Sequence, residues 1–120
     1  MFRLIIAGGR EFSDYPLLAQ NVEAFVNELD DPEIEIVCGC ARGADSLGEE
    51  YGKSKGYKIN YYKPNWDLYG RSAGMIRNNQ MAQNADGLVA FWDGSSKGTK
   101  NMIDLARRRG LKVKVVMYKE

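Results

Sequence analysis

The stretch from Val37 to Asp45, which reads Val-Cys-Gly-Cys-Ala-Arg-Gly-Ala-Asp, combines residue types that bind anions. Gly39 and Gly43 bracket a short turn that contains Arg42, and a helical pattern begins close to Asp45. A turn between a buried strand and a helix directs backbone N–H groups and a guanidinium toward one point, which suits a phosphate or a carboxylate. We predict that this turn forms one wall of a nucleotide-type ligand site.

Two more glycine-rich turns follow apolar segments, at Gly8-Gly9-Arg10 and at Asp93-Gly94-Ser95-Ser96-Lys97-Gly98. Structural roles compete with ligand binding in all three turns. Glycines serve tight turns, Thr99 can cap a helix, and Asp45 can stabilise a helix N-terminus. Neither of these two further turns matches the dinucleotide G-x-G-x-x-G or the P-loop G-x-x-x-x-G-K-[ST] pattern.

Three arginines, Arg10, Arg42 and Arg77, can be ordinary surface charges. Arg10 and Arg42 adjoin glycine turns, which favours contact with an anion. Trp66, Tyr69 and Trp92 can stack on a base or pack on the protein itself, and the sequence leaves these alternatives open.

The absence of one residue type excludes several kinds of chemistry. The chain has no histidine, so Ser-His and Cys-His nucleophilic schemes are ruled out. The two cysteines, Cys38 and Cys40, are separated by a single residue, which argues against a disulfide between them and leaves too few ligands for a zinc site. We expect no metal and no cofactor.

Alternating apolar runs and helical patterns predict an α/β fold. The expected strands are 2–7, 34–38, 57–62, 87–92 and 112–117. Helices are expected from a cap at Ser13 or Asp14 to Asp30-Asp31-Pro32, from Ala44 to Gly56, from Ala73 to Ala85, and from a Thr99 cap to Arg107-Arg108-Arg109-Gly110. We expect Asn65 to Ser72 to be a loop. Five strands alternating with four helices predict one Rossmann-like three-layer domain over residues 1–120, with a parallel sheet in the order 3-2-1-4-5.

That strand order determines where a ligand would bind. In such sheets, ligands bind beyond the C-terminal ends of the strands, where the strand order reverses. The three glycine-rich turns follow strands one, two and four, which are neighbours in this order. We therefore expect the turns to form one crevice.

Composition limits the partners of the chain. The 120 residues carry a net charge of +1, so the overall balance does not indicate nucleic acid or an anionic membrane as a partner. No apolar run approaches the roughly 20 residues that a membrane-spanning helix needs. The N-terminus lacks a signal-peptide pattern, and we expect a cytoplasmic protein.

Five ordered motifs resemble the YspA-like branch of the SLOG superfamily, which includes the DprA/Smf proteins and the LOG phosphoribohydrolases. The motifs are Gly8-Gly9-Arg10-Glu11-Phe12, Gly39 to Asp45, Trp66-Asp67-Leu68-Tyr69-Gly70, Ala73 to Asn78, and Phe91 to Thr99. The resemblance covers nearly the whole chain. It implies a Rossmann-like fold, a nucleotide-derived ligand, a bacterial or phage origin, and a homodimer or larger assembly.

The resemblance also implies a set of ligand-binding residues: Gly8, Gly9, Arg10, Gly39, Arg42, Gly43, Asp45, Asp93, Gly94, Ser96, Gly98 and Thr99, with Arg77 and Asn78 on the rim. One position departs from the LOG hydrolases, which have a catalytic glutamate three residues after the threonine, where this chain has Met102. A thioether cannot act as an acid or a base, so the LOG mechanism is not carried over. Cys40 replaces the usual second glycine of the G-G-A-R-G turn.

The favoured function is a module that senses or sequesters a nucleotide-derived small molecule, in phage–host conflict or stress signalling. The alternative is a hydrolase of an N-glycosidic or phosphoester bond, with Arg42 on the phosphate and Asp45 or Asp93 as the acid–base group. A third reading, binding of single-stranded DNA, is disfavoured by the near-neutral charge and by the lack of an evident basic groove.

Overall fold

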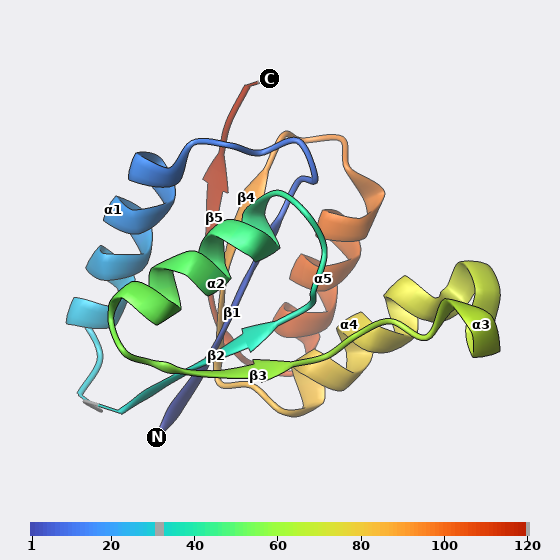
Figure 1. Cartoon of the computed structure of the whole chain (residues 1–120), viewed down its shortest axis with the longest axis horizontal. Coiled ribbons are helices and arrows are strands. Elements are labelled where there is room, and N and C mark those ends of the chain that lie inside the picture. The colour runs from blue at the N-terminus through green and yellow to red at the C-terminus, as the bar shows by residue number, and fades with distance from the viewer. Residues whose placement is uncertain (31–32, 120) are drawn as a thin grey trace.

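The structure is a computed structural model that describes residues 1–30 and 33–119. Its five strands are β1 (Phe2–Gly8), β2 (Ile34–Cys38), β3 (Lys58–Tyr61), β4 (Gly87–Trp92) and β5 (Lys112–Met117). Its α-helices are α1 (Tyr15–Asn27), α2 (Ala44–Ser54), α3 (Trp66–Tyr69), α4 (Ala73–Gln83) and α5 (Lys97–Arg108). All strand pairs are parallel and the order is β3-β2-β1-β4-β5, which confirms the predicted Rossmann-like fold (Figure 1).

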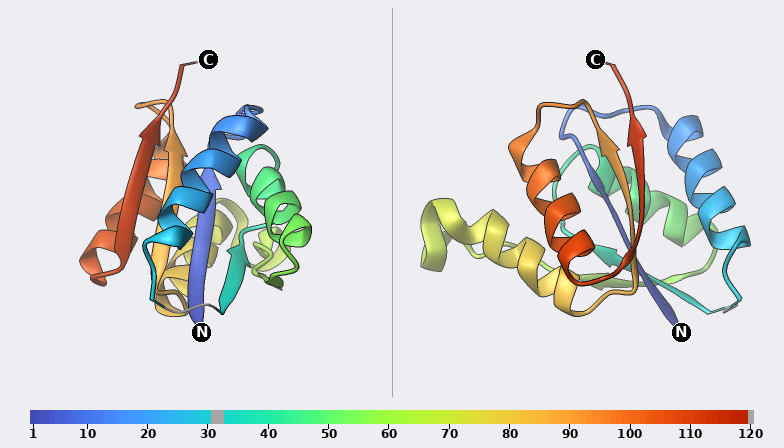
Figure 2. Two further views of the ribbon diagram at one scale, coloured as in Figure 1. Left: turned by 90° about the vertical axis from the view of Figure 1, so that its left-hand side faces the viewer. Right: turned by 180° about the vertical axis from the view of Figure 1, so that it is seen from behind.

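The sheet separates two apolar layers, because successive residues of a strand point to opposite faces. Leu4 and Ile6 of β1 contribute to the cluster that includes residues of α1 and α2, whereas Ile5 contributes to the cluster that includes residues of α4 and α5. Figure 2 shows the helices on both faces of the twisted sheet. The central strand β4 is buried at five of its six positions, as its apolar sequence predicts for the middle of the sheet.

Helix α2 lies unusually close to the sheet. A Cβ atom at Gly48 would lie 2.7 Å from Cγ2 of Ile6, and one at Gly52 would lie 2.7 Å from Cδ1 of Ile59. The two glycines lower the helix propensity of α2 but allow this approach. The helix is held by packing rather than by intrinsic propensity.

Two expectations about local structure are wrong. The stretch Asn65–Ser72 is not a loop: it forms α3 and a 3-10 helix at Gly70–Ser72, because the Asn65 side chain accepts the N–H of Leu68 at 3.1 Å and starts a helical turn. Thr99 does not cap α5. Ser96 does so, and its hydroxyl accepts the Thr99 N–H at 3.5 Å.

The first helix begins as one of the two expected caps predicts, because the Asp14 side chain accepts the N–H of Leu17 at 3.1 Å. The helix ends at Asn27, and the expected stop at Asp31-Pro32 lies outside the described residues. In the described part of the chain, no helix has the length and apolar character that crossing a membrane requires.

Candidate functional site

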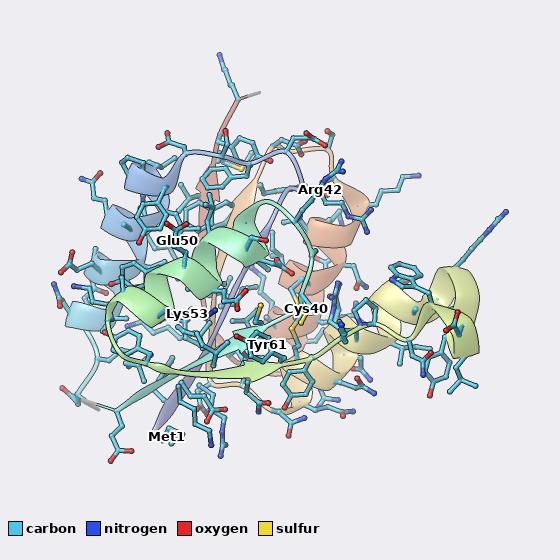
Figure 3. All side chains as sticks on the ribbon, viewed as in Figure 1. Met1, Cys40, Arg42, Glu50, Lys53 and Tyr61 are labelled. Atoms are coloured by element: carbon cyan, nitrogen blue, oxygen red, sulfur yellow. The ribbon has the colours of Figure 1, made fainter. Side chains whose placement is uncertain are left out.

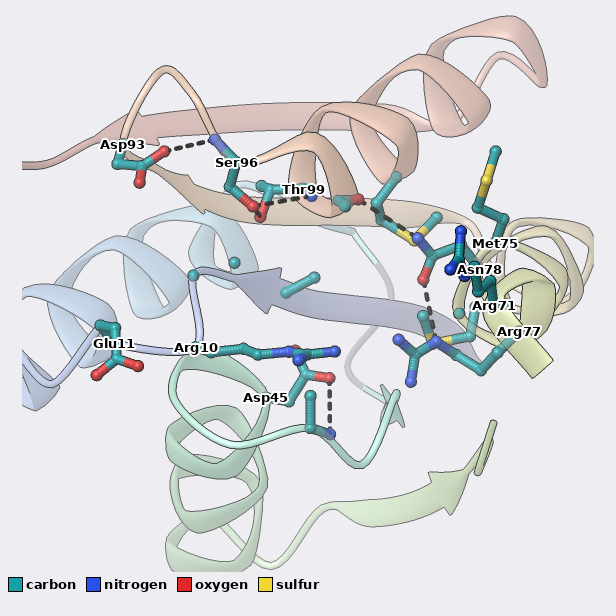
Figure 4. A pocket seen from close by; sticks show the side chains of 18 residues that line it. Arg10, Glu11, Asp45, Arg71, Met75, Arg77, Asn78, Asp93, Ser96 and Thr99 are labelled. Atoms are coloured by element: carbon teal, nitrogen blue, oxygen red, sulfur yellow. Dashed lines mark hydrogen bonds between the residues drawn. The ribbon is translucent and has the colours of Figure 1, made fainter. Parts of the chain in front are cut away.

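A pocket of about 420 Å³ lies beyond the C-terminal ends of β1 and β4. We call it the main pocket. It is lined by the turn after β1, the turn and first residues of α5 after β4, Ala41 and Asp45 from the β2–α2 segment, and residues of α4 (Figure 4). Ten predicted site residues line it: Gly8, Gly9, Arg10, Asp45, Arg77, Asn78, Asp93, Ser96, Gly98 and Thr99.

The turn after β4 is held by its own hydrogen bonds, and the first residues of α5 expose backbone to the main pocket. The carboxylate of Asp93 accepts the N–H groups of Ser95 and Ser96 at 2.9 and 2.8 Å, and these two bonds hold the pKa of Asp93 below its usual value. Gly98 lies in the first turn of α5, and a Cβ atom there would have no neighbour within 4 Å. The backbone of this helix N-terminus is therefore accessible to a ligand, and its dipole favours an anion.

The turn after β2 is built differently. Helix α2 begins at Ala44, its N-cap residue Gly43 provides no side-chain cap, and the Asp45 carboxylate accepts the Ala41 N–H at 3.2 Å. Asp45 is buried, and burial raises the pKa of its carboxyl group although the Ala41 N–H, Arg77 and Arg10 act in the opposite direction. The Asp45 side chain thus forms part of the pocket wall.

Arg77 is half-buried beside this wall. One guanidinium nitrogen donates to the Gly39 carbonyl oxygen, and Nε donates to Oδ1 of Asn78 at 3.0 Å. A Cβ atom at Gly39 would lie 2.9 Å from Nη1 of Arg77 and 2.7 Å from Oδ2 of Asp45. Gly39 does not line the main pocket, and its lack of a side chain makes room for two residues that do.

Asn78 joins α4 to α5. Its amide nitrogen donates to Oδ1 of Asn101 at 3.0 Å and to the Gly98 carbonyl oxygen at 3.4 Å. Its side chain is therefore held against the first turn of α5, and it fixes the position of the arginine that precedes it in the chain.

Gly43, Gly94 and Arg42 also lie outside the lining of the main pocket. Gly43 has a φ of +79°, and a Cβ atom there would overlap the carbonyl oxygen of Gly9, so this glycine allows the turns after β1 and β2 to touch. The exposed guanidinium of Arg42 pairs with the carboxylate of Glu11 at 2.5 Å. Arg42 instead lines a neighbouring hollow, which shares Arg10, Ala41 and Arg77 with the main pocket.

The sequence reasoning missed Arg71 and Met75, which line the main pocket from the side of α4. Arg71 lies within the stretch expected to be a loop, and Met75 follows it. The signal that could have placed them is Asn65, a capping residue just before a short helix. Met102, which stands where the LOG hydrolases have glutamate, is buried and lines the same pocket.

In the described part of the chain, no three Cys, Asp or Glu side chains come together where they could hold a metal ion. The main pocket contains three arginines, Arg10, Arg71 and Arg77, and three carboxylates, Glu11, Asp45 and Asp93. Charged hydrogen-bond donors and an accessible helix N-terminus are suited to an anionic ligand.

The first two of the three glycine turns and α3 fall within residues 2–69, and this part of the chain matches the model of the YspA, cpYpsA-related SLOG family. The chain belongs to this SLOG family. The match confirms the resemblance seen in the sequence, and it covers the turns after β1 and β2 but not the turn after β4.

A solved structure, that of DNA processing protein A (DprA) from Streptococcus pneumoniae, is similar to this SLOG chain with a TM-score of 0.71 and 18% sequence identity. The similarity covers 98% of this chain and 50% of the DprA chain, so this chain spans about half the length of that protein. At this identity the likeness establishes the fold. A search of curated proteins gave no match.

Proposed function

We propose that the main pocket binds the phosphate-bearing part of a nucleotide-derived small molecule, and that the protein senses or sequesters this ligand. The observation that carries the proposal is the meeting of the β1 and β4 turns, Asp45 and three arginines around one pocket. SLOG family membership supports a nucleotide-related ligand.

The main pocket is lined by equal numbers of arginines and carboxylates, but the state of the carboxylates makes it more favourable to an anion than these numbers alone suggest. Glu11 pairs with Arg42, and burial favours the neutral form of Asp45, so Asp93 is the carboxylate that keeps an unpaired negative charge, which two backbone N–H groups stabilise. Within the described part of the chain, the guanidinium groups of Arg10 and Arg71 form no hydrogen bond or salt bridge, although the charge of Arg10 acts on Asp45. Their guanidinium groups are therefore available to a ligand.

Titration calorimetry with AMP, ADP and inorganic phosphate tests this proposal. We expect AMP to bind, and Arg10→Ala to weaken its binding about tenfold or more, because a hydrogen bond to a charged group contributes about 1.5–3 kcal/mol. Arg108→Ala, at the opposite end of α5, is the matched control and should bind AMP like the wild type. If none of the three compounds binds, or if Arg10→Ala binds AMP unchanged, the proposal is wrong.

A hydrolase is the second candidate, because the buried carboxyl of Asp45, with its raised pKa, lines the same pocket. Two features disfavour it. Asp93 is held in its ionised form, which is a poor general acid, and Met102 stands where the LOG hydrolases have glutamate. Mass spectrometry of AMP after incubation distinguishes the two candidates, since release of adenine that Asp45→Asn abolishes would establish the enzyme.

DNA binding is the third candidate. The name of the similar DprA structure refers to DNA processing, but only the fold is shared at this identity. The net charge of +1 argues against a general affinity for nucleic acid. Retention of single-stranded DNA by micromolar protein, lost at higher salt, would favour this candidate instead.

A further inference from the structure

A second hollow adjoins the main pocket, and the proposed function does not account for it. Its volume is also about 420 Å³, and we call it the side hollow. It is lined by Arg10, Cys40, Ala41, Arg42, Pro64, Trp66 and Arg77. Because Arg10, Ala41 and Arg77 line both cavities, these residues form the boundary between the two.

The side hollow has the two chemical features that bind a nucleotide. Three of its seven lining residues are arginines, and no carboxylate is among the seven. It also contains the tryptophan Trp66, which is 50% exposed although it is one of the largest apolar side chains. Arginine binds phosphate through paired hydrogen bonds, and an exposed indole is a stacking surface for any base.

Trp66 lies close to both cavities. The atom nearest to a Cβ placed on Gly74 is Cη2 of its indole, at 3.7 Å, and Gly74 itself lines the main pocket. Helix α3, which begins with Trp66, extends beyond the body of the sheet together with the start of α4 (Figure 1). The indole is therefore supported by α4 and is accessible from the side hollow.

Arg42 lines the side hollow but not the main pocket, and its ion-pair partner is a carboxylate that a ligand phosphate can replace. Arg42 pairs with Glu11, but their side chains are 72% and 66% exposed. An exposed ion pair of this kind contributes little to stability. Figure 3 shows Arg42 on the turn before α2, at the surface of the molecule. A ligand phosphate can replace the Glu11 carboxylate on this guanidinium at little cost.

We propose that the two cavities form one bipartite site for a pyrophosphate-linked dinucleotide. One nucleotide half occupies the main pocket, Arg10 and Arg77 contact the pyrophosphate at the boundary, and the second base stacks on Trp66 with Arg42 on the adjacent phosphate. This inference rests on the proposed function and adds the ligand class, because a mononucleotide leaves the side hollow unused.

Diadenosine diphosphate and AMP are the probes, since they differ by the second nucleotide half. We expect the wild type to bind diadenosine diphosphate at least tenfold more tightly than AMP, because base–aromatic stacking and a phosphate contact are both added. Trp66→Ala should remove most of this difference and leave AMP binding within about twofold of the wild type. Tyr69→Ala, an exposed aromatic of the same helix that lines neither cavity, is the matched control and should preserve the difference.

Variants of Glu11 and Arg42 test the proposal in a second, independent way, through their affinity for diadenosine diphosphate. Glu11→Gln should tighten binding of diadenosine diphosphate severalfold because Arg42 loses its competing partner, and this gain should be absent when Arg42→Ala is also present. Quenching of tryptophan fluorescence by diadenosine diphosphate but not by AMP, lost in Trp66→Phe, would report the stacking directly.

The outcomes separate the two proposals. If AMP binds but diadenosine diphosphate binds no tighter, or if Trp66→Ala weakens both probes equally, the bipartite site is wrong and the main pocket stands. A change in molecular mass of Trp66→Ala by light scattering, with both probes weakened equally, would identify Trp66 as a contact between copies and would also overturn it. If neither probe binds the wild type, the bipartite site is wrong, and the proposed function fails as well if ADP and inorganic phosphate do not bind.

Discussion

The turns after β2 and β4 are similar in sequence, yet they have different structural roles. Both carry glycines, an aspartate and a following helix, and both strands lie next to β1. After β4, the side chains of Asp93 and Ser96 accept backbone N–H groups of the turn and of α5, and the backbone at the start of α5 remains accessible. After β2, the glycines allow close contacts, and Asp45 is folded into the wall. The first residues of α5, after the β4 turn, expose backbone to the main pocket, whereas the β2 turn forms part of the pocket wall.

If the two turns differ in this way, the largest loss of stability comes from adding a methyl group at Gly43, in the turn after β2. Gly43→Ala combines a φ of +79° with overlap on the Gly9 and Arg10 carbonyl oxygens, and we expect a loss of about 3 kcal/mol in unfolding free energy. Gly94→Ala has a similar φ of +89°, but its nearest contact is the flexible end of Met117 at 3.3 Å, so we expect about 1 kcal/mol. Urea denaturation measures both. Equal losses would show that the two turns are not different in kind.

A smaller effect comes from the side-chain helix cap that the β4 turn has and the β2 turn lacks. Ser96→Ala removes the hydroxyl that accepts the Thr99 N–H, and we expect a loss of about 1 kcal/mol in unfolding free energy. Ser46→Ala, in the first turn of α2, is the comparison, because that hydroxyl bonds to the Ala41 carbonyl oxygen and caps no N–H group. A larger loss at Ser46 than at Ser96 would contradict the assignment of the two turns.

The smallest expected changes in stability come from replacing Asp45 and Asp93, and they are of opposite sign. The pKa of Asp45 is raised above its ordinary value of 3.8, so ionising it costs stability as the pH rises from 3.8 through the raised pKa. Asp45→Asn should therefore melt slightly higher than the wild type at pH 7, with the difference closing toward pH 3.8.

Asp93 should behave in the opposite way. Its pKa is lowered from 3.8, so its ionised form adds stability above 3.8, and this is lost as the pH falls through the lowered pKa. Asp93→Asn should melt slightly lower than the wild type at pH 7. The melting temperatures of both variants, measured between pH 3 and pH 8, test these predictions. Changes of the same sign in the two variants at pH 7 would contradict them.

Apolar periodicity predicted the five strands, and right-handed crossovers limited the possible strand orders; the expected order 3-2-1-4-5 is the one observed. The bounds of β4 and β5 are those predicted. The stretch before α4 was misjudged because a helix of four residues has too little periodicity to detect, and its start depends on one hydrogen bond of Asn65.

The sequence predicted that the turns after β1, β2 and β4 lie close together, but not which of their side chains line the main pocket. Turns that follow neighbouring strands must meet, so Gly9, Asp45 and Thr99 could be placed together. The direction of the Arg42 side chain could not be placed in the same way, because its partner Glu11 is 31 residues away in the chain and belongs to a different turn. Motif reasoning shows which residues lie near the main pocket, but the hydrogen bonds and ion pairs of each side chain decide whether that side chain faces the pocket.

Tyr118, just past β5, packs against Phe12 with ring centroids 4.8 Å apart, and its hydroxyl lies directly beneath Gly9. Met1, in contrast, precedes β1 at the far end of the sheet (Figure 1). A tether or reporter fused after residue 120 would therefore pull on the floor of the first glycine turn, whereas one fused before residue 1 would be mechanically remote from it. Immobilisation through the N-terminus should leave binding measurements undistorted, and the same attachment at the other end should distort them.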